Sequence, residues 1–160
     1  VQMKLATVKD FLYWEMLNRL KGKNVDVVCC YLMHEDKLLA QTAQRNEFIH
    51  TNDTQYVVPG GKVDLCEKEF QAVHCYMKEE TNLNVDILKN FGTARNNKYE
   101  LHCYLCVPMD ISQMKVMEPN KQKELKCISL DEPINWTHAN QRAFDRFLHV
   151  LRNYRQYIRG

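Results

Sequence analysis

The sequence predicts a mixed α/β layered domain. Three features predict this class: short apolar, strand-like segments, one central segment with helical spacing between them, and a second helical segment near the C-terminal end. A length of 160 residues is enough for one domain with its own core. We interpret residues 23–160 as that domain and residues 1–22 as an N-terminal helical extension.

The extension at 1–22 has the pattern of an amphipathic helix. Thr7 fits an N-cap, with Asp10 three positions later as in a capping box, and Gly22 fits a helix stop. We expect this helix to pack on the domain or on a second subunit, so the chain is expected to be a monomer or a homodimer. Its apolar residues follow a near-helical spacing: Phe11, Trp14, Leu17 and Leu20.

The strands are predicted from apolar segments and the turns between them. Val25–Leu32 is largely apolar, so both of its faces are expected to be covered. A turn at 35–37 leads to a hairpin partner, Lys37–Gln41, and a polar loop at 45–54 precedes the short strand Tyr56–Val58. Further strands are predicted at Val85–Phe91, Lys98–Val107 and Lys126–Leu130.

Two helices are predicted within the domain. The central helix, Glu67–Glu80, has Phe70, Val73 and Met77 at positions i, i+3 and i+7. The final helix covers about Ala139–Tyr157, and four of its residues are expected to face inward: Phe144, Phe147, Leu148 and Leu151. Its other side has four arginines, which we interpret as a solvated face: Arg142, Arg146, Arg152 and Arg155.

The composition excludes several classes of protein. A net charge of +2 is too small for nucleic-acid binding by bulk electrostatics, and no apolar segment approaches the ~20 residues that span a bilayer. Cys103 and Cys106 form a CxxC, but on a strand they point to opposite faces, so we interpret them as core thiols rather than a metal knuckle. Seven cysteines in strand-like surroundings predict reduced thiols and a cytoplasmic location: Cys29, Cys30, Cys66, Cys75, Cys103, Cys106 and Cys127.

The segment Tyr56–Val85 is the most informative for function. A strand ends at 59–61 (Pro-Gly-Gly), where glycine permits a sharp turn and a close approach to a ligand. A helix follows and ends in the adjacent pair Glu79 and Glu80, with Glu67 near its other end. Adjacent carboxylates aimed into a loop favour a hard divalent cation such as magnesium, which also binds phosphate. A solvated glutamate pair at a helix end is the alternative interpretation.

This spacing resembles the Nudix box, G-x5-E-x7-R-E-U-x-E-E-x-G-U, where U is a bulky aliphatic residue. Gly61 fits the first glycine, Glu67 follows after five residues, and Glu79 and Glu80 fit the glutamate pair without any insertion. The resemblance covers about residues 25–150. It implies a Nudix α/β/α sandwich of the MutT-like type, with a mixed central sheet and an extra N-terminal helix. Two further residues fit the bulky slots: Met77 and Leu83.

Three positions depart from the box. Cys75 stands in the arginine slot, Tyr76 in the next glutamate slot, and Asn82 in the second glycine slot. In the family that glutamate is a metal ligand, and tyrosine is a poor magnesium ligand that lacks the charge near neutral pH. Asparagine tolerates a left-handed backbone better than most residues, so the change at Asn82 is milder.

The resemblance also implies the site residues. The catalytic carboxylates would be Glu67, Glu79 and Glu80, and the metal ligands Glu79, Glu80 and Gly61, holding Mg²⁺ or alternatively Mn²⁺. Lys62 could meet a phosphate as a point charge. The residues implied in substrate binding are Gly60, Gly61, Lys62 and Asn140.

Asn140 has two interpretations. It precedes the last helix where MutT-type proteins read a purine with an asparagine, and an amide both donates and accepts hydrogen bonds. It could instead cap the helix backbone. Glu118 and Glu124 lie where the family often brings a further acidic ligand or base, and the sequence does not choose between them.

The sequence therefore predicts a Nudix-type, Mg²⁺-dependent hydrolase that cleaves the diphosphate linkage of a nucleoside di- or triphosphate-like small molecule. The alternative is a catalytically weak or inactive Nudix domain that binds nucleotide or RNA as a sensor or scaffold, since the carboxylate at position 76 is lost. RNA is the less favoured ligand, and no membrane partner is predicted.

Overall fold

The structure is a computed structural model that describes residues 25–43, 54–95, 98–117 and 124–159. The extension predicted at 1–22 and nearly all of the loop predicted at 45–54 lie outside the described residues. The elements in chain order are β1 (Val25–His34), β2 (Lys37–Thr42), β3 (Tyr56–Val57), β4 (Gly60–Lys62), α2 (Glu69–Thr81), β5 (Val85–Arg95), β6 (Tyr99–Pro108), the 3₁₀ helix η1 (Ile111–Gln113), β7 (Leu125–Ser129) and α3 (His138–Arg159).

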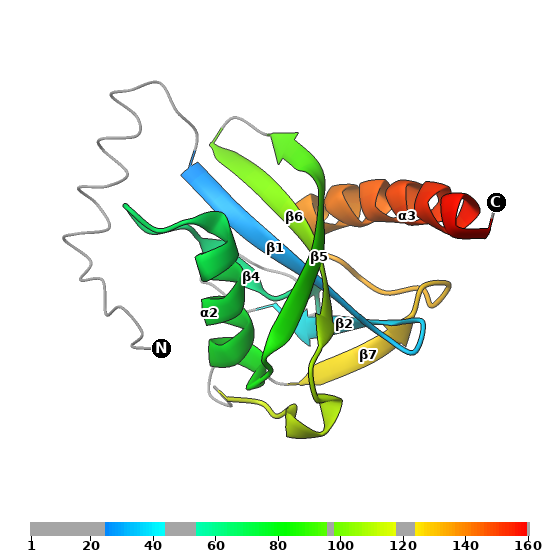
Figure 1. Cartoon of the computed structure of the whole chain (residues 1–160), viewed down its shortest axis with the longest axis horizontal. Helices are drawn as coiled ribbons and strands as arrows, with labels where there is room; N and C mark the ends of the chain where they lie inside the picture. The colour runs from blue at the N-terminus through cyan, green and yellow to red at the C-terminus, as the bar shows by residue number, and fades with distance from the viewer. Residues whose placement is uncertain (1–24, 44–53, 96–97, 118–123, 160) are drawn as a thin grey trace.

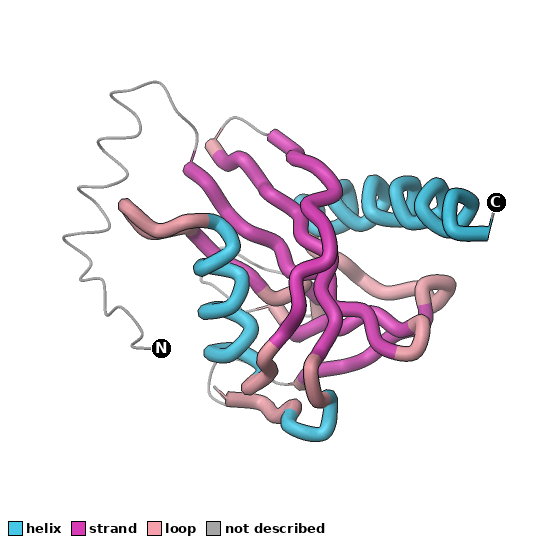
Figure 2. Tube along the Cα trace, viewed as in Figure 1, coloured by secondary structure: helices cyan, strands magenta, loops and turns pink. Residues whose placement is uncertain are grey.

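Strand β1 is the centre of a mixed sheet. It runs parallel to β6 from the pair Val25 and Tyr99 to the pair Leu32 and Cys106. It pairs antiparallel with both β2 and β4, while β5 pairs antiparallel with β6. Strand β2 also pairs with β3 and β7, so the order along the main path is β3-β2-β1-β6-β5 (Figures 1 and 2). The prediction of a mixed sheet is confirmed.

The two faces of the sheet are covered by different helices. Successive residues of a strand point to opposite faces, so Val28 and Cys30 pack with Met77 of α2, whereas Cys29 packs with Phe147 of α3. Figure 1 shows α2 and α3 on different sides of the β1–β6–β5 region. This arrangement gives the predicted α/β/α layers, and it confirms that both faces of β1 are covered.

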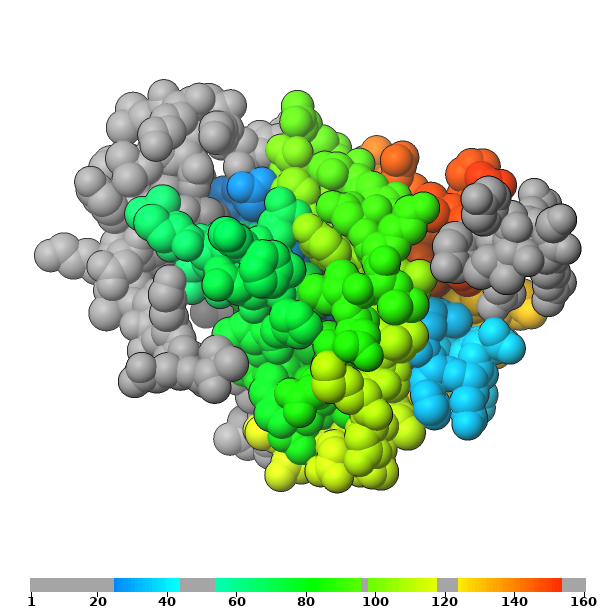
Figure 3. Space-filling view, viewed as in Figure 1, coloured from blue at the N-terminus to red at the C-terminus, as the bar shows by residue number. Residues whose placement is uncertain are grey.

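The space-filling view shows how α2 joins the sheet. Side chains of α2 and β5 lie beside one another on the visible face, which agrees with the contacts between these two elements (Figure 3). Met77 is fully buried beneath α2. Burying a side chain of this size stabilises the fold by about 1.5–3 kcal/mol, which fixes the helix on the sheet.

The CxxC pair divides between the two cores. Cys103 belongs to the α3-side core and Cys106 to the α2-side core, and both side chains are buried. Burial raises the pKa of the Cys106 thiol to about 12. The interpretation of these two residues as core thiols is confirmed.

Three sequence predictions about local structure are corrected. Phe70 is 48% exposed, because the inward side of α2 begins one turn later, at Ala72 and Val73. Helix α2 starts at Glu69 rather than at Glu67, since residues 65 and 66 form a turn. Strand β3 ends at Val57, before the Pro-Gly-Gly segment, but the two glycines begin a further strand, β4, that was not predicted.

The C-terminal helix follows the prediction closely. Phe144, Phe147 and Leu151 are buried against the sheet, and Leu148 is partly buried at the edge of the same core. The arginines at 142, 146 and 152 are exposed, as predicted for the opposite face. No helix in the described ranges is both long enough and apolar enough to cross a membrane.

Candidate functional site

The glycine pair lies where β4 crosses closest to β1. Gly60 has φ +154°, and a Cβ at this position would lie 2.1 Å from the main-chain oxygen of Val28. No other residue type fits such a contact, so glycine is required here. The Cys30 amide donates to the Pro59 oxygen across 2.8 Å, which continues the pairing beyond the glycines.

The C-terminal end of α2 meets this glycine turn. The Gly60 amide donates a hydrogen bond to Oε2 of Glu80 across 3.0 Å. Asn82 ends the helix in the left-handed conformation, with φ 64°, and its side-chain amide donates to the Gln113 oxygen across 2.9 Å. The structure therefore brings Glu80 and Gly60 together, and asparagine meets the backbone requirement of the second glycine slot.

The loop before α2 is held by Glu67. Its carboxylate Oε1 accepts from the Asp64 amide across 3.1 Å, and its own amide donates to the Asp64 oxygen across 3.0 Å. These reciprocal bonds close the loop on itself. Glu67 thus braces the loop in this structure.

Tyr76 fills the space between the loop and the helix end. Its hydroxyl donates to the Lys62 oxygen across 2.6 Å. Its ring lies so close to Gly61 that a Cβ there would be 2.4 Å from the ring carbon Cζ. Glycine at position 61 therefore leaves the space that the ring of Tyr76 occupies.

Carboxylates surround Tyr76. Burial raises the pKa of its phenol far above the ordinary value, and nearby carboxylates raise it further: Asp64, Glu67, Glu79 and Glu80. The phenol is therefore neutral near neutral pH and cannot replace a glutamate as a charged ligand. Among the described residues, no three of these carboxylates bring one oxygen each within 4.8 Å of one another.

Asp64 is a member of this acidic group that sequence reasoning missed. It lies three residues before Glu67 in the loop, the two residues are joined by hydrogen bonds, and its charge helps to raise the pKa of Tyr76. The signal in the sequence was an acidic residue within the loop that follows the glycines. Cys75, in the arginine slot, is partly buried, and its pKa is raised by burial and then by Glu79 and Glu67.

Lys62 follows the glycines and lies beside an aromatic ring. Its Nζ is 5.7 Å from the centroid of the Tyr99 ring, and Nζ of Lys98 lies 5.3 Å from the same ring. Lys62 pairs with Val27 in the β1–β4 register, and Gly61 pairs with Val28. Because residues alternate along a strand, Lys62 faces the α3 side, away from Tyr76.

Asn140 is engaged at both ends of its side-chain amide. Its Oδ1 accepts from the Val58 amide across 3.1 Å, and its Nδ2 donates to Oγ1 of Thr137 across 3.0 Å. These bonds attach the start of α3 to the segment before the glycine turn. Asn140 thus lies near the predicted site, in contacts made by the protein itself.

The two acidic candidates of the later segment have different positions. Glu124 is exposed and accepts from the Tyr56 hydroxyl across 2.5 Å. This contact raises the pKa of Tyr56. Glu118 lies outside the described residues.

Comparison with solved structures finds Nudix proteins with the same arrangement. A protein assigned to the Nudix hydrolase family from Chromobacterium violaceum aligns with a TM-score of 0.64 at 20% identity, covering 80% of this chain and 79% of that one. A MutT Nudix hydrolase from Burkholderia pseudomallei aligns with a TM-score of 0.61 at 20% identity, covering 78% and 98%. An ADP-ribose pyrophosphatase from Streptococcus suis aligns with a TM-score of 0.64 at 18% identity, covering 83% and 93%.

These likenesses establish that the chain has the Nudix fold, a mixed sheet between helices. Comparison of the sequence with protein-family models and with curated proteins finds no match. The fold agrees with the resemblance read from Gly61, Glu67 and the Glu79–Glu80 pair. The fold alone does not define the function, because one fold can support many functions.

Proposed function

We propose that this protein is a Nudix-type hydrolase that cleaves the diphosphate linkage of a nucleoside di- or triphosphate-like substrate with Mg²⁺. The observation that carries the proposal is the hydrogen bond from the Gly60 amide to Glu80, 3.0 Å long. It places a carboxylate of the C-terminal end of α2 against the backbone of the glycine pair. Mn²⁺ would be accepted by the same ligands, because it also prefers oxygen donors.

The donor set fits a hard cation. Carboxylates of Glu79 and Glu80 and the main-chain oxygen of Gly61 are oxygen ligands, and magnesium commonly uses one or two carboxylates together with substrate phosphates. Tyr76 adds no charge at this place. We therefore expect the metal to bind weakly to the protein alone and more tightly together with a nucleotide.

The residues of the chain would act in distinct ways. Glu79 and Glu80 would hold the cation, and Glu67 would keep the loop in position through its bonds to Asp64. The phosphate would bind beside the Gly60–Gly61 backbone, and Lys62 would contact it as a point charge from the α3 side of the sheet. When bound, magnesium would polarise the phosphate and help to activate water.

A second function is favoured by Tyr76. Its ring lies against Gly61 and its hydroxyl bonds to Lys62, so the slot of a metal-binding carboxylate is filled by a neutral side chain. Such a protein would bind a nucleotide, or less favourably RNA, with little turnover. Under either proposal, Asn140 would hold the segment before the glycine pair in place through its bond to Val58.

The test compares Glu80→Gln with the original protein. Glutamine keeps the size and can still accept from Gly60, but it loses the charge that a hard cation requires. Phosphate and pyrophosphate release is measured over a panel of nucleoside di- and triphosphates with Mg²⁺ or Mn²⁺. Glu132→Gln is the matched control, since that carboxylate belongs to a surface ion pair with Lys126.

The hydrolase proposal expects turnover in the original protein and in Glu132→Gln, and its loss in folded Glu80→Gln. Equal turnover in Glu80→Gln would remove the metal assignment. Nucleotide-induced thermal stabilisation without any turnover in the original protein would select the binding function.

A further inference from the structure

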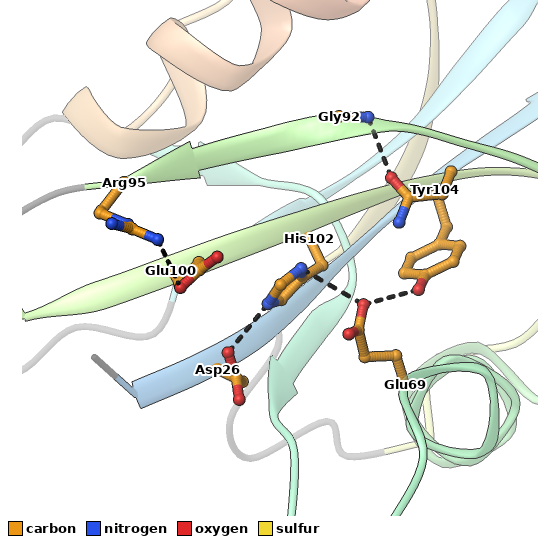
Figure 4. A network of polar contacts seen from close by, with 8 residues as sticks. Asp26, Glu69, Gly92, Arg95, Glu100, His102 and Tyr104 are labelled. Atoms are coloured by element: carbon orange, nitrogen blue, oxygen red, sulfur yellow. Dashed lines mark hydrogen bonds and ion pairs between the residues drawn. The ribbon is translucent and has the colours of Figure 1, made fainter. Parts of the chain in front are cut away.

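A second cluster of metal-ligating side chains lies at the other end of α2. Asp26 is near the start of β1, Glu100 and His102 lie on β6, and Glu69 lies in the first turn of α2 (Figure 4). Asp26 pairs with Glu100 in the parallel register, so both face the α2 side. Glu69 precedes Glu80 by eleven residues, which corresponds to about 16 Å along a helix.

The ligand atoms converge. One such atom each from Asp26, Glu100 and His102 lies within 4.8 Å of the other two. Nε2 of His102 is 2.9 Å from Oδ1 of Asp26. Two donors bound at about 2.1 Å to one ion, and about 90° apart, are separated by roughly 3.0 Å. The pair thus has the spacing of neighbouring ligands in an octahedral site.

The other ring nitrogen of His102 is positioned by Glu69. Nδ1 lies 3.3 Å from Oε1 of Glu69, and the same oxygen accepts from the Tyr104 hydroxyl across 2.6 Å. Metal-binding histidines commonly donate their second N–H to a carboxylate, which fixes the tautomer. With Nδ1 donating to Glu69, the lone pair of Nε2 is left for an ion.

Charge and access also favour a cation. Three carboxylates, those of Asp26, Glu69 and Glu100, surround one imidazole, and Arg95 contacts Glu100 across 3.3 Å. With a neutral imidazole, this group retains negative charge that a divalent ion would balance. The His102 side chain is 12% exposed and that of Asp26 48%, so the site is sheltered but open to solvent on one side.

We propose that Asp26, Glu100 and His102 bind a divalent transition-metal ion of the Mn²⁺ to Zn²⁺ class, with Glu69 as a positioning residue. One nitrogen and two carboxylate ligands suit these ions better than Mg²⁺, which prefers oxygen alone. The site is separate from the Glu79–Glu80 end of the helix, and it does not depend on the function proposed above. A bound ion would join β1 to β6, and Glu69 would link His102 to the start of α2.

The experiment measures Mn²⁺ binding to chelator-treated, tag-free protein carrying Glu79→Gln and Glu80→Gln, so that the other end of α2 does not contribute. Electron spin-echo spectroscopy of the bound Mn²⁺ reports imidazole nitrogen as a ligand. We expect one bound ion per chain with nitrogen modulation. The bound ion and the nitrogen modulation should both be lost in His102→Gln. Both should be retained in His74→Gln, which changes an exposed histidine of α2.

Two partly exposed positions keep the test decisive if His102→Gln does not fold. Asp26→Asn and Glu100→Gln should each weaken Mn²⁺ binding by more than about tenfold, and Glu69→Gln by about 10–100-fold. No Mn²⁺ binding in the starting protein, binding without nitrogen modulation, or unchanged affinity in both ligand variants would overturn the site. His102 would then join Asp26 and Glu69 through polar contacts alone.

Discussion

The hydroxyl of Tyr76 donates a hydrogen bond to the main-chain oxygen of Lys62 across 2.6 Å. This bond joins α2 to the last residue of β4, the strand that contains the glycine pair. The tyrosine therefore has a structural partner in the place where the Nudix box has a glutamate. Its effect on the site can be separated from its effect on stability by substitution.

Tyr76→Glu is expected to raise Mg²⁺ affinity and to lower stability. The new carboxylate would join Glu79 and Glu80, while the bond to Lys62 and the ring contact with Gly61 would be lost. A net loss of about 1–3 kcal/mol is expected for leaving the Lys62 oxygen without its partner. Calorimetric titration with Mg²⁺ and urea unfolding measure the two effects. Unchanged Mg²⁺ affinity in a folded variant would show that the slot is not a vacated ligand position.

The raised pKa of Tyr76 predicts a loss of stability at alkaline pH. Because the fold favours the neutral phenol, this stabilisation is fully present below the ordinary tyrosine pKa of about 10 and is lost as the pH rises above it toward the folded pKa. Tyr76→Phe should cost about 1 kcal/mol at neutral pH. Unfolding free energies measured at increasing pH should converge above pH ~10. Parallel curves would contradict the assignment of a neutral, buried phenol.

The layers of the fold could be predicted from the sequence because they rest on local patterns. These patterns can be recognised without knowledge of any tertiary contact: the apolar segment at Val25–Leu32 and the spacing of Val73 and Met77. The exposure of Phe70 could not be predicted, since an apolar residue at the right helical spacing can still lie beyond the edge of the sheet. The strand at Gly60–Lys62 was missed because its pairing with β1 depends on a distant segment.

The candidate site could be predicted from the sequence only in part, for a similar reason. Spacing indicated Glu67, Glu79 and Glu80 as candidates, and α2 fixes the positions of Glu79 and Glu80. The partner of Tyr76 is a main-chain oxygen, which has no signature in a sequence. The His102 cluster joins Asp26 to a residue 76 positions away, and only the parallel pairing of β1 and β6 brings the two together.

The two glycines are expected to respond differently to a second substitution. Gly60→Ala places Cβ against the Val28 main chain in a strained backbone, so it should cost at least about 2 kcal/mol in any background. Gly61→Ala meets the Tyr76 ring instead. Its cost should fall by about 0.5–3 kcal/mol when Tyr76→Ala is also present. A double-mutant cycle by urea unfolding measures this coupling, and rescue of Gly60→Ala by the same change would contradict the geometry.

The last prediction concerns Asn140, whose amide joins Val58 to Thr137. Removing this amide leaves a partly buried main-chain donor without its partner, so Asn140→Ala should lower stability by about 1–2 kcal/mol. Asn140→Asp should cost less, because a carboxylate oxygen can still accept from Val58. Asn153→Ala is the control, since this asparagine of the same helix is exposed.

Ligand binding separates this structural role from base reading. If Asn140 acts through the position of the turn, affinities for a purine and a pyrimidine nucleotide should fall together in Asn140→Ala, with a lower melting temperature. A site that reads the base would lose purine affinity selectively, because selectivity depends on polar groups that the wrong base leaves unpaired. The hydrogen bonds to Val58 and Thr137 favour the first result. A selective loss of purine binding with an unchanged melting temperature would assign the amide to the base.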